Sequence, residues 1–497
     1  MRNWKTVSTV IIVGLLTIWL AIVLFTSTRH EFWRDEVRAL SIARAAHSPL
    51  DIFRIRNEGH PALWYLLLYL CKSIVDSPLV LPVLSITIAF AAVVLFLFRA
   101  PFPLWLRALF IFSALPLYEY SVMARNYGIS MLLFFIAAAL YRERDEHPLW
   151  LAFVLALLAN TNIHSAMLVG LVAIVWMWDF VARKKAGAIQ LSVLSLCFGL
   201  AIIVAGLALC LVVALPTKDT IVTRAYSVTA KQVFAALLDT VWRPQIGVLL
   251  YLLIFCLLRR VDLFLAGLGG LIGFGVFFRV VYPGSYRHQG IFLVFVLFLY
   301  WLTAESPAET ILPTKIRRWL DVGFKIGLYG ALPALLLGNV YKDKVIIVDI
   351  KREMSSSQAF GAFLNQSNAY RNAIIVAEPA FLVESLPFYA TNPIYLPREH
   401  RFGNWVAFDA KADPDLSLGQ LLSIARDLQT QRSEPVLIVL GKWQTKKHKD
   451  GFRMTLYGRW KFTWTTNELD EADRTLTQVA DFNKALTAEN YKVMAFK

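Results

Sequence analysis

The chain has 497 residues, of which 57% are hydrophobic and 17% charged, and its formal net charge is +15 at pH 7. Ordinary soluble domains carry about 25% charged residues, so this composition excludes such a domain and predicts a polytopic membrane protein. In a membrane protein, a basic surplus usually faces anionic lipid headgroups. We therefore expect membrane lipids, and no nucleic acid, among its partners.

The first apolar segment, residues 7–25, is about as long as a membrane-spanning helix. It follows Arg2 and Lys5, and the sequence after it, "TSTRHEFW", is unlike the small-residue site at which a signal peptide is cleaved. We interpret the segment as a retained membrane anchor.

Further apolar segments follow along the chain. They cover residues 79–98, 108–119, 127–141, 148–160, 164–181, 190–215, 246–258, 263–282, 290–303 and 320–340. Together with the anchor, they predict about eleven transmembrane helices.

One more apolar stretch, residues 61–75, decides which loops share a side of the membrane. If it crossed, five basic loops from "FRAPFPLWLR" to "TKIRRW" would lie outside, against the preference of Lys and Arg for the cytoplasmic side. We therefore predict a juxtamembrane helix at this position. Residues 27–78 then form the first outer loop with its juxtamembrane helices.

From Lys342 onward the pattern changes to short runs rich in Val and Ile, separated by polar helical stretches such as "SLGQLLSIARDLQTQ". The runs "DKVIIVDI", "AIIVAEP", "PIYLP", "PVLIVLG" and "YKVMAF" are typical of buried strands. The predicted fold is thus a polytopic α-helical membrane domain over residues 1–341, followed by a soluble, extracytoplasmic α/β domain over residues 342–497.

Motifs for structural metals and nucleotides are missing from the sequence. The four cysteines lie inside apolar segments without C-x-x-C or Cys/His spacing, and no G-x-G-x-x-G follows a strand. We expect no disulfide framework, zinc site or dinucleotide site.

Nearly all unusual polar residues of the membrane domain fall in its predicted outer segments. They are Asp35, Glu36, His60, Glu119, Arg125, Tyr127, His164, Tyr286, Arg287 and His288. Ionisable groups at a membrane boundary are costly and usually functional. Their gathering on one face therefore predicts a site there.

The residue types leave several chemistries open. Asp35 and Glu36 could supply a general base, bind a hard divalent cation, or simply complement the positive end of a helix. The arginines of the outer segments suit a lipid-linked phosphate, which a guanidinium grips bidentately, but they could equally neutralise nearby acids and headgroups. Residues 34–36 alone do not decide between these readings.

Three motifs occur in a fixed order: "RDE" at residues 34–36, "EGHPALWYLLLY" at residues 58–69, and a proline at 116 followed by "ARNY" at residues 124–127. In this arrangement the chain, over roughly residues 9–300, resembles the GT-C class of polyprenyl-phosphate-sugar-dependent glycosyltransferases. The similarity is to the branch of protein O-mannosyltransferases and bacterial lipid A aminoarabinose transferases. It implies a GT-C-like membrane domain.

The resemblance also implies roles for particular residues. Asp35 matches the acid that deprotonates the acceptor, and Glu36 completes the usual acid pair. The "SYRH" segment matches the basic and aromatic residues that face the lipid phosphate. The implied phosphate-binding residues are Tyr286, Arg287 and His288, with Arg125. Glu119 corresponds to a second outer-loop acid, and His60 stands where the family usually has proline. The remaining candidate residues are Tyr127 and His164.

The implied reaction is an inverting transfer of one sugar from a polyprenyl-phosphate donor to an envelope lipid, glycan or protein. A phosphate monoester leaves with its own charge, so we expect no obligatory metal, although a divalent cation is compatible with the acid pair. The implied location is a bacterial inner membrane, with the active site and the second domain facing the periplasm. The alternatives are a lipid or polysaccharide transporter or flippase, and an O-antigen-type ligase or polymerase.

Overall fold

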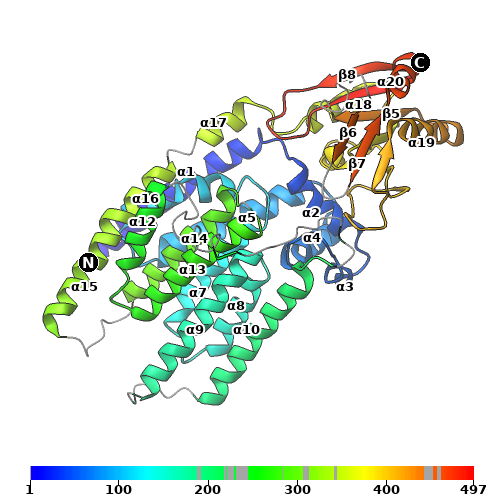
Figure 1. The fold of residues 1–497 in the computed structure, drawn as a ribbon. Helices are drawn as coiled ribbons and strands as arrows, with labels where there is room; N and C mark the ends of the chain where they lie inside the picture. The colour runs from blue at the N-terminus through cyan, green and yellow to red at the C-terminus, as the bar shows by residue number, and fades with distance from the viewer. Residues whose placement is uncertain are drawn as a thin grey trace.

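The structure is a computed structural model, and it describes residues 2–185, 187, 192–217, 220, 229–230, 244–282, 284–305, 313–340, 344–441, 452–455 and 460–497. It consists of a helical bundle and a C-terminal region that contains all of its named strands (Figure 1). The two regions lie against each other at one end of the bundle.

The first half of the bundle runs from α1 to α8. Its elements are α1 (Arg2–Ser27), α2 (Arg34–Ala45), α3 (Pro49–Ile52), α4 (Leu63–Ile74), α5 (Val80–Arg99), α6 (Leu104–Ile111), the π-helix η1 (Leu115–Glu119), α7 (Tyr127–Tyr141) and α8 (Pro148–Ala159). The second half consists of α9 (Ile163–Lys185), α10 (Val193–Ala214), α12 (Pro244–Phe255), α13 (Val261–Val280), α14 (Tyr286–Glu305), α15 (Thr314–Ile326), the π-helix η2 (Gly327–Ala331) and α16 (Leu332–Val340).

Within the described residues, seven helices are long and apolar enough to cross a membrane. These are α1, α5, α9, α10, α13, α14 and the continuous stretch from α15 into α16, and they match seven of the eleven predicted segments. The other four predicted segments form shorter helices, because residues 108–119 divide between α6 and η1, and α7, α8 and α12 span 12 to 15 residues each. The expected juxtamembrane stretch forms α4, which has 12 residues.

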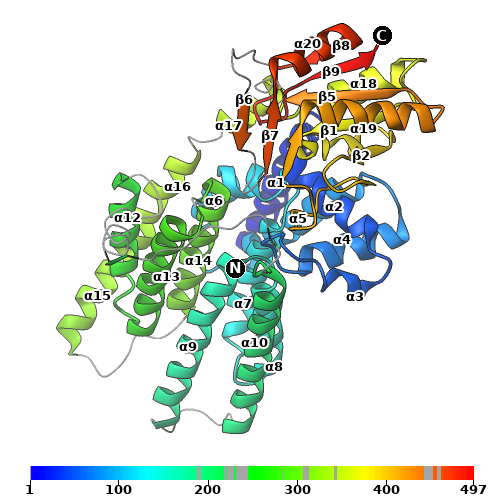
Figure 2. The ribbon, with the colours of Figure 1, turned by 45° about the vertical axis from the view of Figure 1, so that its right-hand side comes forward.

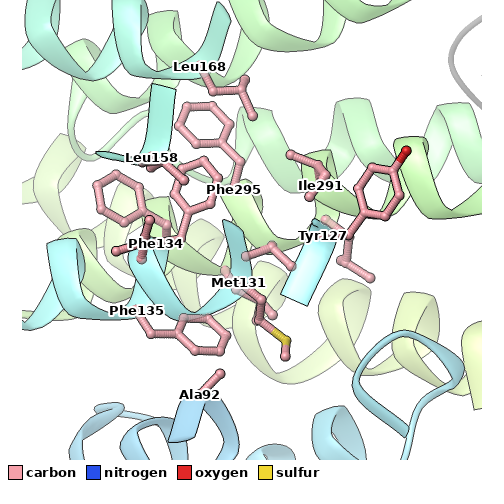
Figure 3. Close-up of a cluster of buried hydrophobic side chains, with 14 of the residues drawn as sticks. Ala92, Tyr127, Met131, Phe134, Phe135, Leu158, Leu168, Ile291 and Phe295 are labelled. Atoms are coloured by element: carbon pink, nitrogen blue, oxygen red, sulfur yellow. The ribbon is translucent and has the colours of Figure 1, made fainter. Parts of the chain in front are cut away.

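The core of the bundle forms around α7 and α14. Every residue from Ile291 to Thr303 on α14 is buried, as expected for a helix that is apolar on all sides. Figure 3 shows Phe134 and Phe135 of α7 between Phe295 of α14 and Ala92 of α5. Near its start, α14 comes close to η1. A Cβ atom added at Gly290 would overlap Leu115 Cδ2 of η1. Packing therefore fixes the end of α14 that carries Arg287.

The C-terminal region contains two sheets. Its strands are β1 (Ile374–Glu378), β2 (Ile394–Leu396), β3 (Arg401–Phe402), β4 (Asp415–Ser417), β5 (Val436–Gly441), β6 (Phe452–Thr455), β7 (Lys461–Trp464), β8 (Leu476–Phe482) and β9 (Tyr491–Phe496). The larger sheet has the order β3-β2-β1-β5-β9-β8, with β1 parallel to β2 and β5, and the smaller has the order β4-β7-β6. The named helices around them are α17 (Lys344–Lys351), α18 (Ser357–Gln366), α19 (Leu418–Gln431) and α20 (Thr466–Thr475).

Four of the five predicted strands are confirmed as β1, β2, β5 and β9, and the predicted helix as α19. The fifth prediction is wrong, because "DKVIIVDI" contributes to α17 and not to a strand. A short apolar run does not reveal by itself whether it is helix or strand. Here Ile346 and Ile350, four residues apart, join the core of the bundle, so tertiary contact with the bundle favours the helix.

A buried ionic network ties together the ends of α7, α9 and α13. Asp179 accepts hydrogen bonds from Arg144 at 2.7 Å and from Arg183 at 2.9 Å, and Arg260 lies 3.6 Å away. These arginines belong to three of the basic loops that were predicted to share one side. Figure 2 shows that this end of α9 points away from the C-terminal strands.

We expect Asp179→Asn to lower the free energy of unfolding by about 3 to 5 kcal/mol, because breaking a buried ionic network leaves uncompensated charge. Unfolding of the purified protein in detergent measures the effect. Glu146→Gln, an exposed change in the adjoining loop, serves as the control. Equal stability of the Asp179→Asn and control proteins would contradict a structural role for the network.

Candidate active site

The segment that follows α1 places its two acids on the opening turn of α2. The helix begins at Arg34, after an extended Trp33, so Asp35 and Glu36 lie where the helix dipole favours negative charge. Successive helical residues point about 100° apart, and the two carboxylates accordingly have different partners.

Asp35 lies among three arginines. Arg125 Nη1 donates to its Oδ2 at 2.5 Å, and Arg34 Nε donates to its Oδ1 at 3.4 Å. Burial by itself would raise the pKa of Asp35, but Arg125, Arg34 and also Arg287 outweigh burial and hold this pKa well below its usual range. Asp35 is therefore ionised throughout the physiological pH range.

Arg125 is shared between Asp35 and His60. Its Nη2 lies 3.2 Å from His60 Nε2, and its guanidinium carbon lies 5.8 Å from the ring centre of Tyr127. Burial and the charge of Arg125 lower the pKa of His60 to about 3, so the imidazole is neutral and accepts this hydrogen bond. The turn before His60 needs Gly59, whose φ of 68° suits glycine.

Arg287 approaches from the first turn of α14. Its guanidinium carbon lies 5.2 Å from the ring centre of Trp33, and its carbonyl accepts a hydrogen bond from Tyr120 at 2.7 Å. Its buried Nε has no hydrogen-bond partner in the described part of the chain. Arg287 thus brings a second positive charge close to Asp35, with a donor left for a ligand.

Neutral polar groups lie beside the arginines. The ring centre of His288 lies 5.3 Å from that of Tyr127 and 5.1 Å from that of His164. The Ser285 amide donates to His288 Nδ1 at 2.9 Å, which leaves the proton of the neutral ring on Nε2. Among the described residues, the Tyr127 hydroxyl and both His164 nitrogens make no hydrogen bond although they are buried. Figure 3 shows the Tyr127 hydroxyl directed away from Phe134 and Phe135.

Glu36 is fully buried and bound by the protein itself. Its Oε1 accepts from the Ala124 amide at 2.7 Å, and its Oε2 accepts from His30 Nε2 at 3.0 Å. His30 Nδ1 donates to Asp349 Oδ2 at 2.8 Å. Burial alone would lower the pKa of His30, but Glu36 and Asp349 raise it to about 10.

The structure thus brings together most of the residues that the sequence pointed to. Those that meet are Asp35, His60, Arg125, Tyr127, His164, Arg287 and His288. Glu36 lies next to Asp35 but binds His30 and the Ala124 amide. Glu119 ends η1 half-buried, and Tyr286 packs against the core at the start of α14.

Sequence reasoning missed His30, Arg38, Asp349, Glu384 and Glu489. The only local signal was the position of His30 and Arg38 in the first charged segment. The three acids lie more than 300 residues from the groups that they bind: Asp349 pairs with His30, Glu384 with Arg38, and Glu489 with the Arg34 amide. No sequence pattern indicates such pairs.

The described side chains include no group of three or more His, Cys, Asp or Glu placed to hold a metal ion. What they do provide is an ionised carboxylate beside two arginines from different segments, with uncharged imidazole and phenol groups next to them. Such a set can bind an anion and accept a proton.

Replacing Asp35 with Asn should lower the free energy of unfolding by roughly 1.5 to 3 kcal/mol, the range for hydrogen bonds to charged groups. The pKa of Asp35 is lower in the folded protein than in the unfolded chain. Its contribution is therefore complete above about pH 4 and is lost as the pH falls through the folded-state pKa.

Thermal unfolding of both proteins in detergent tests this expectation. The difference in Tm should stay constant between about pH 6 and 8 and shrink only below about pH 4. Asp76→Asn, which breaks an exposed ion pair with Arg44, is the control. A difference that already vanishes between about pH 6 and 8 would contradict the strongly lowered pKa.

No family model matches the chain, and no curated protein matches its sequence.

Proposed function

We propose that the protein is a membrane glycosyltransferase that moves one sugar, with inversion, from a polyprenyl phosphate to an acceptor of the cell envelope. The observation that carries the proposal is the meeting of Asp35 with Arg125 and Arg287, which come from three different segments of the chain. The proposed setting is a bacterial inner membrane, with the site and the C-terminal domain facing the periplasm.

In the proposed reaction, Asp35 is the base, and Arg125 and Arg287 bind the phosphate of the donor. The acceptor hydroxyl oxygen attacks the anomeric carbon, and Asp35 takes the proton that this oxygen loses. The bond between the anomeric carbon and the phosphate oxygen breaks, and the lipid phosphate departs with the electron pair. Arg125 and Arg287 stabilise the charge that collects on this phosphate.

The low pKa of Asp35 limits its strength as a base before the donor binds. A carboxylate held by three arginines is ionised but is a weak base. A donor phosphate bound by Arg125 and Arg287 would give both guanidiniums a second anion, and it would raise the pKa of Asp35 toward its ordinary value. In this proposal Asp35 becomes an effective base only once the donor is bound.

The surroundings of the arginines suit the uncharged part of such a donor. Tyr127, His164 and His288 offer neutral hydrogen-bonding atoms among aromatic rings, including that of Phe278, whose centre lies 5.3 Å from the His164 ring. Ligand sites commonly combine apolar and aromatic walls with a few polar groups that fix orientation. We assign the sugar ring to this part of the site.

The test is a transfer assay with the purified full-length protein, a labelled polyprenyl-phosphate sugar and an envelope extract as acceptor. We expect Asp35→Ala to lower kcat by about 100-fold or more, the usual contribution of a general base. Asp76→Asn, which lies outside the site, should retain full activity. Absence of transfer by the native protein, or full transfer by Asp35→Ala, would overturn the proposal.

A separate prediction concerns the donor phosphate. Arg287→Ala should raise KM for the labelled donor by about tenfold or more, because a hydrogen bond between charged groups contributes roughly 1.5 to 3 kcal/mol. The same assay measures it. Arg142→Ala removes an exposed arginine at the opposite end of α7 and should leave KM unchanged. Equal KM values for both variants would rule out phosphate binding by Arg287.

A further inference from the structure

We propose that the C-terminal domain positions the helix that carries Asp35, with Asp349 and Glu489 as the positioning residues. Both act on α2 from more than 300 residues away in sequence, Asp349 through His30 and Glu489 through the Arg34 amide. The attachment of α2 stands by itself, whereas its effect on catalysis rests on the proposed function.

The first attachment is a buried bridge of one histidine between two carboxylates. Both ring nitrogens of His30 lie within hydrogen-bond distance of a carboxylate oxygen, one from Glu36 on α2 and one from Asp349 on α17. Carboxylates only accept, so both nitrogens carry protons and His30 is a cation. All three side chains are almost completely buried. A buried charge deprived of its partner is strongly destabilising, so α2 and α17 hold each other in place.

The second attachment caps α2 from outside. The first turn of a helix has backbone amides without partners inside the helix, and the side chain of the residue before α2, Trp33, does not cap it. Glu489 Oε1 accepts from the Arg34 amide at 2.8 Å. Its other oxygen accepts from the hydroxyls of Ser355 and Ser385. Glu489 is thus held by its own domain while it fixes the residue next to Asp35.

Further contacts extend the same interface one turn along α2. Arg38 donates to Glu58 and to the Val406 carbonyl, each at 2.6 Å, and forms an ion pair with Glu384. Ahead of the helix, the ring of Phe32 lies 4.6 Å from that of Phe388, centre to centre. Figure 2 shows α2 at the end of the bundle that faces the C-terminal domain. The domain therefore contacts α2 before, at and after its first turn.

These contacts explain why Glu36 follows Asp35. Asp35 faces Arg125, and Glu36, about 100° further round the helix, faces His30 and the Ala124 amide. The Ala124 amide directly precedes Arg125, so Glu36 also fixes the partner of Asp35. Misplacing a reacting group by about 1 Å can cost 100-fold in rate. Loss of Asp349 or Glu489 should therefore act on catalysis without either residue touching the substrate.

Hydrogen–deuterium exchange of the full-length protein tests the attachment directly. We expect Asp349→Ala and Glu489→Ala to increase amide exchange in residues 34–45. Exchange in residues 291–303, at the core of the bundle, should stay unchanged, which shows that the bundle remains folded. Asp427→Ala, an exposed change on α19, is the matched control. Unchanged exchange of α2 in both test variants would overturn the proposal.

The transfer assay tests the catalytic consequence. Both alanine variants should lower kcat by about 10- to 100-fold with KM for the donor within about twofold of the native value. Glu489→Gln keeps an oxygen for the Arg34 amide and should recover most of kcat. A rise in KM alone, or no recovery by Glu489→Gln, would contradict positioning. If the native protein transfers no sugar, the proposed function fails, and the exchange experiment still decides the attachment of α2.

Discussion

The ion pair between Asp35 and Arg125 is the contact on which the arrangement of this end of the bundle depends. A carboxylate partly removed from water is costly unless a cation accompanies it. Here the cation comes from a loop about 90 residues later and is also the partner of His60. Pairing these charges therefore brings the start of α2 to the start of α7, and Arg287 adds the start of α14.

The same pairing shapes the proposed chemistry. Arg125, Arg34 and Arg287 hold the pKa of Asp35 low, and a carboxylate with a low pKa is a weak base. A donor phosphate, as proposed, would compete for the same guanidiniums, and the shared arginines would then link donor binding to the base strength of Asp35. In the proposed reaction, such a link would prevent activation of an acceptor before a donor is in place.

The C-terminal domain belongs to this arrangement through the other acid of the pair. Glu36, His30 and Asp349 form a chain of buried charges that joins α2 to α17. Buried ionic groups contribute little net stability but require exact geometry. The domain border predicted after residue 341 lies close to α17, the helix that carries Asp349. The bundle and the C-terminal region are therefore joined at this place both by the chain itself and by the paired charges.

The sequence by itself determined the apolar helices, four of the five predicted strands and the gathering of acids and arginines in a few segments, because hydropathy and residue type are local properties. It did not determine that "DKVIIVDI" is helical, since Ile346 is buried by the bundle and Ile350 packs against the same core, and their own sequence neighbours do not provide these contacts. Nor did it separate the roles of Asp35 and Glu36. Only the tertiary structure assigned Arg125 to one and His30 to the other, because partners distant in sequence decide which face of α2 each acid meets.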